Sequence, residues 1–342
     1  MTTKKLDGLS HIAFETTDRC NLDCVFCYNI WKINGAVRTP FNSYRKASDA
    51  LQEIFNQANI KSVALTGGEP FMSERFVEIA LFCRMAGKQV TIISNGTQGS
   101  TNDHKQLLKM GVGLFEFPIH SAQEAIHNRM TGIPNSWAKS LASVKTVLSL
   151  GGQVVPVVVI TRHNVNHLGE TLDFIHSLGC RRIMLNRYNI GGRGCANPLE
   201  VSATADELRR AFAVANAKST ELGLRLTSNV CSPVCLLNPR DYPNIGFGHC
   251  SFNVVQRPIT LDINGNIRLC NHSPVMAGNI FERHISDILF SDYSDLWENS
   301  IPKLCTTCAE WQQCKGGCRA ASEQCGFTLE MADPIIEALE VI

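Results

Sequence analysis

The segment TTDRCNLDCVFCYN, residues 16–29, brings three cysteines close together: Cys20, Cys24 and Cys27 are separated by three and then two residues. Three thiolates on one loop can hold three corners of a cubane iron–sulfur cluster, which leaves the fourth iron without a protein ligand. Such an open metal position favours chemistry over electron storage alone. Zinc is the alternative, but three thiolates without a nearby fourth ligand are unusual for a closed structural zinc site.

Around this segment, short β-rich runs alternate with amphipathic helical stretches from residue 11 to about 227. The expected strands cover residues 11–16, 62–66, 89–94, 113–119, 153–161 and 181–186. The expected helices cover residues 43–58, 73–86, 102–110, 137–150, 166–178 and 205–222. Six successive βα units require a parallel sheet with right-handed crossovers, and six are too few to close an eight-fold barrel. We therefore predict an α/β fold, a partial (β/α)6 barrel of the TIM type, with its active site at the C-terminal ends of the strands.

The pattern changes near residue 229 to short Pro-, Gly- and Cys-rich segments, with no long helix before residues 334–341. A region so poor in local structure needs cross-links, which its cysteines can supply through metal. We predict two domains: a barrel over residues 1–228 and a small, irregular, Cys-rich iron–sulfur domain over residues 229–342.

Two glycine-containing motifs follow the second and third expected strands, TGGEP at residues 66–70 and SNG at residues 94–96. Paired glycines let the backbone approach a ligand closely, and Glu69 is a suitable partner for an ammonium group. Either motif alone could be an ordinary turn. Both follow the cysteine loop in order, each at the end of a successive strand.

In that order, the motifs resemble those of the radical S-adenosylmethionine (SAM) enzymes. The resemblance implies a [4Fe–4S] cluster on the three cysteines, chelated at its open iron by the amino and carboxylate groups of SAM. The reduced cluster of such enzymes cleaves SAM into methionine and a 5′-deoxyadenosyl radical, which takes hydrogen from an unactivated C–H bond. The implied SAM contacts are Phe26, Gly67, Gly68, Glu69, Pro70, Ser94, Asn95, Asn186 and Arg187.

The C-terminal cysteines resemble the SPASM extension of radical SAM enzymes, which carries two auxiliary iron–sulfur clusters. The resemblance implies Cys250, Cys270 and Cys318 for the first auxiliary cluster, and Cys305, Cys308, Cys314 and Cys325 for the second. The protein would then hold three [4Fe–4S] clusters. A zinc ribbon is the alternative, but seven cysteines suit it poorly. Cys231 or Cys235 could complete the first cluster, and Cys235, nearer Cys250 in sequence, is preferred. If neither reaches it, one iron stays open and could bind substrate.

A general base is harder to assign. Anaerobic sulfatase maturases, a SPASM subgroup, have an Asp base where this chain has Asn271, which takes no proton at neutral pH. Formylglycine formation is therefore disfavoured. The remaining candidate bases are Glu116, His120, His272 and Tyr188. His120, after the fourth strand, is preferred as the catalytic residue by position, and Arg187 is expected to pair with a carboxylate of SAM or substrate.

Charge and hydrophobicity exclude two classes of binding partner, nucleic acids and membranes. The net charge of +1 argues against a nucleic-acid surface, and no apolar stretch reaches the length of a membrane span or resembles a signal peptide. We expect a cytoplasmic protein in which Cys83, Cys180 and Cys195 are small core residues or incidental thiols, and clustered thiols in a reducing cytosol favour metal binding over disulfides.

The resemblance implies hydrogen abstraction from a side chain of a ribosomally made peptide, leading to cross-linking or oxidation. A small-molecule dehydrogenase or tailoring enzyme is the runner-up, and a non-catalytic metal protein that keeps only the fold is a third alternative. A first strand at residue 11 leaves no room for an N-terminal leader-binding domain. A separate leader-binding protein would then deliver the peptide, or the barrel mouth would recognise it. The electron donor would be a flavodoxin- or ferredoxin-type reductant.

Overall fold

A computed structural model describes residues 5–32, 42–250, 253–326 and 328–339. Its strands are β1 (His11–Glu15), β2 (Ser62–Thr66), β3 (Gln89–Ile93), β4 (Leu114–Pro118), β5 (Val154–Ile160), β6 (Arg182–Arg187), β7 (Arg225–Ser228), β8 (Ile245–Phe247), β9 (Thr260–Asp262), β10 (Asn266–Arg268) and β11 (Gly278–Asn279). Its helices are α1 (Tyr44–Gln57), α2 (Phe76–Met85), α3 (Thr101–Lys109), α4 (Glu124–Thr131), α5 (Ser136–Ser149), α6 (Leu168–Ser177), α7 (Ala205–Leu222), α8 (Ile285–Leu289), α9 (Asp292–Asn299), α10 (Trp311–Cys314), α11 (Arg319–Gln324) and α12 (Ile335–Ala338).

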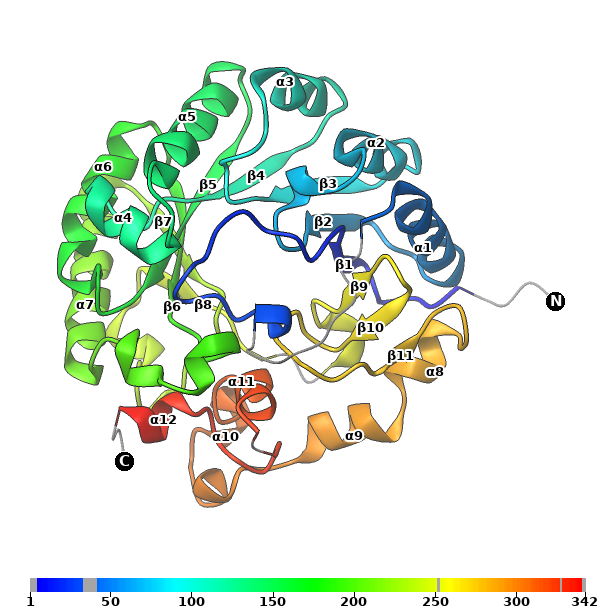
Figure 1. Cartoon of the computed structure of the whole chain (residues 1–342). Helices are drawn as coiled ribbons and strands as arrows, with labels where there is room; N and C mark the ends of the chain where they lie inside the picture. The colour runs from blue at the N-terminus through cyan, green and yellow to red at the C-terminus, as the bar shows by residue number, and fades with distance from the viewer. Residues whose placement is uncertain (1–4, 33–41, 251–252, 327, 340–342) are drawn as a thin grey trace.

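The strands form one continuous sheet in the order β11-β10-β9-β1-β2-β3-β4-β5-β6-β7-β8. Each strand from β1 to β7 pairs in parallel with its successor, and α1 to α3 and α5 to α7 cover the outside of the curved sheet (Figure 1). Within the described residues, β8 and β11 stand at opposite ends of this order, so the barrel stays open. The predicted α/β fold with a parallel sheet is confirmed, and the open, curved sheet is compatible with the predicted partial barrel. The six expected strands lie within one residue or so of β1 to β6.

The sheet is larger than the sequence predicted. The parallel strands β7 and β8 extend one edge, but with four and three residues they are too short for hydrophobic periodicity to reveal. At the other edge, β9 pairs in parallel with β1, placing Thr260 opposite Ala13, and β10 and β11 continue antiparallel. The sheet therefore crosses the predicted domain boundary at residue 228.

Side-chain caps explain where several helices begin. Ser43 precedes α1 and accepts a hydrogen bond from the Lys46 amide. Capping boxes start α3 (Ser100 with Asp103) and α7 (Thr204 with Glu207). The short helix α4, which the sequence analysis did not expect, follows β4. None of the helices in the described ranges has the length and apolar character needed to cross a membrane.

Candidate functional site

The loop that carries Cys20, Cys24 and Cys27 follows β1 and is held by the TGGEP motif. The Gly68 amide donates to the Thr17 carbonyl at 2.7 Å, and the Glu69 amide donates to the Arg19 carbonyl at 2.7 Å. A Cβ atom on Gly67 would lie 2.3 Å from the Thr17 oxygen, and one on Gly68 would lie 2.2 Å from the Arg19 oxygen. The paired glycines are therefore needed for the end of β2 to lie against the segment leading into Cys20.

Glu69 connects the TGGEP and SNG motifs. Its fully buried carboxyl accepts hydrogen bonds from the Phe71 amide (3.1 Å), the Ser94 hydroxyl (2.8 Å) and the Asn95 amide (2.7 Å). Burial raises the pKa of Glu69 to about 7, against the opposing effect of these donors. Pro70 begins the 3-10 turn that follows.

Asn95 brings the SNG motif to the cysteine loop. Its side-chain amide donates to the Asn21 carbonyl oxygen at 3.0 Å and lies 3.8 Å from the Cys20 sulfur. Asn21 in turn donates to the Thr97 hydroxyl at 2.8 Å. The structure therefore brings the cysteine loop and both motifs together at the C-terminal ends of β1, β2 and β3, the edge of the sheet that the sequence analysis predicted.

His120 lies beside the same loop, in edge-to-face contact with Phe26 at 4.7 Å between ring centroids. The His120 ring is buried, and its Nδ1 accepts a hydrogen bond from the Val159 amide at 3.2 Å. Since an amide can only donate, the proton of neutral His120 is on Nε2. Burial, followed by the neighbouring His127, holds the pKa of His120 well below its usual value. This environment makes His120 a hydrogen-bond donor with no free lone pair, which does not suit the predicted general base.

Asn186 and Arg187 contact the C-terminal region, whereas the sequence analysis expected contacts with SAM. The Asn186 side-chain oxygen accepts from the amides of Asn229 (2.9 Å) and Val230 (3.3 Å). The fully buried Arg187 pairs with Asp333 and donates to the Cys231 carbonyl at 2.6 Å. It also donates to the Tyr188 carbonyl at 3.0 Å and to Ser232 at 3.3 Å. The Arg187 guanidinium group therefore already has protein acceptors. Its carboxylate partner is Asp333, which is 146 residues away in sequence.

The other candidate bases differ in their surroundings. The Tyr188 ring is buried, and burial raises its pKa to about 12. His272 is bonded through Nε2 to the Ile190 carbonyl at 3.0 Å, and burial lowers its pKa to about 4. Glu116 lies between Phe115 and Phe117 on β4. Both phenylalanines pack against His104 of α3 on the helix-covered face, so Glu116 points to the barrel interior.

Burial raises the pKa of Glu116 to about 7. A carboxyl group with such a pKa exchanges its proton near neutral pH, as a general base must. Among the four candidates, Glu116 therefore has the surroundings that best suit proton transfer.

The C-terminal cysteines gather in two sets. The first set is Cys231, Cys250, Cys270 and Cys318. The pKa of Cys231 is raised by its hydrogen bond with Cys250 and then by burial, and the nearby Cys318 and Cys270 raise it further. The second is Cys235, Cys305, Cys308 and Cys314: burial and then the thiolates of Cys314, Cys308 and Cys235 raise the pKa of Cys305 to about 11.

These sets differ from the sequence assignment at two positions. Cys235 lies in the second set, and Cys231 takes the place expected for it in the first. The turn starting at Pro233, whose carbonyl accepts from the amides of Leu236 and Leu237 (both 3.0 Å), separates the two cysteines. Spacing along the chain does not reveal such a turn.

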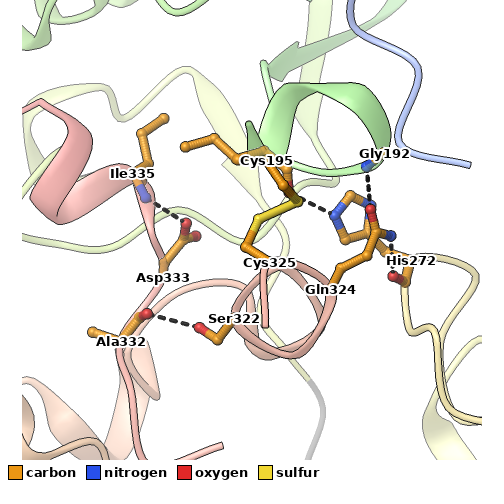
Figure 2. Close-up of a disulfide and its surroundings, with 10 residues drawn as sticks. Gly192, Cys195, His272, Ser322, Gln324, Cys325, Ala332, Asp333 and Ile335 are labelled. Atoms are coloured by element: carbon orange, nitrogen blue, oxygen red, sulfur yellow. Dashed lines mark hydrogen bonds between the residues drawn. A yellow bond between two sulfur atoms is a disulfide. The ribbon is translucent and has the colours of Figure 1, made fainter. Parts of the chain in front are cut away.

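Cys325 forms a disulfide with Cys195 (Figure 2). The sequence analysis instead assigned Cys325 to the second auxiliary cluster and disfavoured disulfides. The neighbouring Gln324 fixes this region: its side-chain oxygen accepts from the Gly192 amide, and its side-chain nitrogen donates to the His272 carbonyl at 2.7 Å. Among the described residues, no three His, Cys, Asp or Glu side chains are arranged around a single metal ion. In a cubane cluster, by contrast, each cysteine binds its own iron.

The sequence analysis did not predict an ion pair between Arg193 and Asp23 of the cysteine loop. Arg193 forms a two-pronged ion pair with Asp23, with nitrogen–oxygen distances of 2.5 and 3.2 Å. The adjacent Gly192 packs so closely that a Cβ atom there would lie 2.3 Å from the Cys27 carbonyl oxygen. The only sequence signal for this contact is the glycine-rich run GGRG at residues 191–194.

Comparison with known proteins shows which proteins this chain resembles. Residues 14–175 match the model of the radical SAM superfamily. The chain is 22% identical to the PqqA peptide cyclase of Methylobacterium sp. (strain 4-46) over 338 residues, which cover 94% of this chain and 84% of the relative. It is 22% identical to the PqqA peptide cyclase of Xanthomonas euvesicatoria pv. vesicatoria (strain 85-10), covering 95% and 87%.

Solved structures share the fold at lower identity. SuiB of Streptococcus suis bound to its precursor peptide SuiA superposes with a TM-score of 0.71 at 17% identity, covering 94% of this chain and 74% of SuiB. The structure of anSMEcpe with bound AdoMet superposes with a TM-score of 0.75 at 14% identity, covering 97% of this chain and 91% of that one.

Proposed function

We infer that this chain, whose residues 14–175 form a radical SAM domain, is a radical SAM enzyme that abstracts hydrogen from a side chain of a ribosomally made peptide and so initiates cross-linking or oxidation. The observation that carries the proposal is the convergence of Cys20, Glu69 and Asn95 at adjacent strand ends. Similarity to PqqA peptide cyclases and to a SuiB structure with its precursor peptide supports a peptide as substrate.

The residues at this edge suit a [4Fe–4S] cluster and SAM. Cys20, Cys24 and Cys27 provide three thiolates and leave one iron open. When bound, the cluster and SAM supply a 5′-deoxyadenosyl radical that takes hydrogen from a C–H bond. A carboxylate has about four lone-pair sites. Three protein donors reach Glu69, so one acceptor position remains for the ammonium group of SAM, whose positive charge would lower the raised pKa.

Other residues would shape the same site. We assign Phe26, fixed by His120, to the apolar side of the SAM pocket, and Gly67, Gly68, Pro70, Ser94 and Asn95 to the backbone turns around it. Glu116, on the interior face of β4, is the proposed general base in place of His120. Asn186 and Arg187 are assigned to holding the residues around Cys231.

Two auxiliary [4Fe–4S] clusters complete the proposed cofactor set. Their donors are the two sets of C-terminal cysteines, with Cys231, Cys250, Cys270 and Cys318 binding the first. They would receive the electron that remains after hydrogen abstraction and pass it on, so the enzyme would act as an oxidoreductase. A flavodoxin- or ferredoxin-type protein in the cytoplasm would supply the starting electron, and a separate leader-binding protein would present the peptide.

The first test compares the anaerobically purified protein with the Cys20/Cys24/Cys27 triple Ala variant. Dithionite-reduced wild type should cleave SAM to 5′-deoxyadenosine and contain about 12 irons per chain, and the variant should cleave none and contain about 8. Absence of cleavage by the fully loaded wild type would leave a non-catalytic metal protein.

The second test separates a peptide from a small molecule. Peptides with perdeuterated side chains, including PqqA and SuiA sequences, are compared with the corresponding free deuterated amino acids. Deuterium should appear in 5′-deoxyadenosine only with a peptide. Transfer only from free amino acids would favour the alternative, a small-molecule tailoring enzyme.

A further inference from the structure

The C-terminal region has one cysteine more than two clusters need. Nine cysteines follow residue 228. Two cubane clusters with a full set of thiolate ligands would use about eight. In the structure the ninth is Cys325, which is bonded to Cys195 and lies in neither set.

Contacts between two segments bring Cys235 to the second set. The Val234 amide donates to the Cys314 sulfur at 3.3 Å. At the C-terminal end of residues 233–240, Arg240 makes a bidentate ion pair with Glu310, at 2.8 and 3.2 Å. At the N-terminal end of the same segment, the Pro233 ring lies 2.7 Å from where a Cβ atom on Gly317 would be. Residues 233–240 therefore run alongside residues 310–317, with Cys235 facing the CX2CX5C cysteines.

Cys235 has the chemical surroundings of a fourth ligand. Its neighbours include the sulfur atoms of Cys314 and Cys308. Arg209 donates to its carbonyl at 3.1 Å and fixes the backbone at that point. Cys235 thus adds a fourth cysteine to the three of the CX2CX5C run, the number that a cubane cluster takes.

Cys325 is fixed at a different place. It follows α11, and the adjacent Gln324 bonds to Gly192 and to His272, so this end of α11 is anchored to the loop after β6 (Figure 2). The disulfide with Cys195 belongs to the same contact.

We propose that Cys235, Cys305, Cys308 and Cys314 hold the second auxiliary cluster of this chain, and that Cys325 lies outside the cluster as the covalent partner of Cys195. The assignment rests on the proposed second auxiliary cluster. It replaces the last cysteine of the SPASM pattern with one from upstream of that pattern.

The test uses the Cys20/Cys24/Cys27 triple Ala variant as background, because it leaves only the auxiliary clusters, about 8 irons per chain. Into it are placed Cys235→Ser, Cys325→Ser, Cys195→Ser and, as a matched control, Cys83→Ser, a buried thiol on α2 outside both sets. The readouts are iron and sulfide content and the EPR spectrum after dithionite reduction, recorded with and without cyanide, which binds an iron that lacks its protein ligand.

Three of the variants should keep about 8 irons and give the same EPR spectrum with and without cyanide, namely Cys325→Ser, Cys195→Ser and Cys83→Ser. Cys235→Ser should lose about 4 irons, or keep them and gain a cyanide-sensitive signal. Iron loss or cyanide sensitivity in Cys325→Ser, with Cys235→Ser unaffected, would overturn the assignment. A background that holds only about 4 irons would instead remove the second cluster from the proposed function itself.

A second measurement addresses the covalent link. Peptide mapping of the non-reduced full-length protein should recover a cross-link between Cys195 and Cys325. Recovery of both peptides separately, with alkylated thiols, would overturn the covalent part of the proposal.

Discussion

Replacing Gly68 with alanine tests whether the TGGEP motif positions the cysteine loop. A Cβ atom at this position would lie 2.2 Å from the Arg19 oxygen, 2.6 Å from the Arg19 carbonyl carbon and 2.7 Å from the Asp18 oxygen. All three are backbone atoms, which cannot rotate aside. Reaching ordinary contact at 3.4 Å requires a displacement of about 1.2 Å (3.4 minus 2.2) at the residue before Cys20.

That displacement breaks the hydrogen bonds from Gly68 to Thr17 and from Glu69 to Arg19. Leaving such groups unpaired costs about 1–3 kcal/mol for each bond, so the Gly68→Ala variant, which breaks two, should lose roughly 2–6 kcal/mol of unfolding free energy. Denaturant unfolding of the metal-free protein measures this loss. The loaded protein should hold about 8 irons instead of about 12, because the first cluster needs Cys20 in place.

Gly113→Ala is the matched control. Nothing lies within 4 Å of a Cβ atom at Gly113, and its backbone is not left-handed. The change should stabilise the protein slightly, by about 0.4–1 kcal/mol, through the unfolded chain. Full iron content and unchanged stability in Gly68→Ala would refute the steric argument.

Three further predictions follow from individual contacts. Glu116→Gln should keep SAM cleavage but lower the yield of modified peptide. The folded-state pKa of Glu116, about 7, lies above the usual glutamate value of 4.5, so its contribution to stability is complete below pH 4.5 and is lost as the pH rises through 7. Wild type should lose stability relative to Glu116→Gln over that window, by at most about 3 kcal/mol before solvent screening, and parallel pH profiles would contradict the raised pKa. Arg187→Met leaves the buried Asp333 unpaired and should cost about 3–5 kcal/mol, partly recovered in Arg187→Met/Asp333→Asn, with equilibrium binding of SAM unchanged; loss of SAM affinity alone would return Arg187 to the SAM site. A chain ending at residue 228 lacks β9 and exposes the edge of β1, so it should aggregate on expression, and a soluble, monomeric product on size-exclusion chromatography would contradict this.

The sequence predicted the parallel strands β1 to β6 well because they alternate with helices long enough to show their periodicity. It also placed the cysteine loop and the motifs with Glu69 and Asn95 after successive strands, and the C-terminal ends of neighbouring parallel strands share one edge. The short strands β7, β8 and β9 carry too few residues for such a pattern.

Local sequence patterns could not predict which side chains pair when they lie far apart in the sequence. Asp333 is 146 residues from Arg187, and nothing local in either segment predicts their pairing. The choice between Cys231 and Cys235 depends on a turn between them, and the link from Cys195 to Cys325 joins positions 130 residues apart. His120 was predicted as the base from its position after the fourth strand, and its hydrogen bond to Val159 depends on how β4 and β5 align.

The pairing of β1 with β9 also sets an order for biosynthesis. Thr260 follows its partner Ala13 by 247 positions (260 minus 13). At translation rates of about 5–20 residues per second, β9 leaves the ribosome at least about 12 seconds after β1. During that interval one edge of β1 lacks its partner, and an unpaired edge invites association with other nascent chains. The cysteine loop is thus synthesised well before β9, the strand whose pairing covers the open edge of β1. Iron delivery matched to this order would act after β9 has paired with β1.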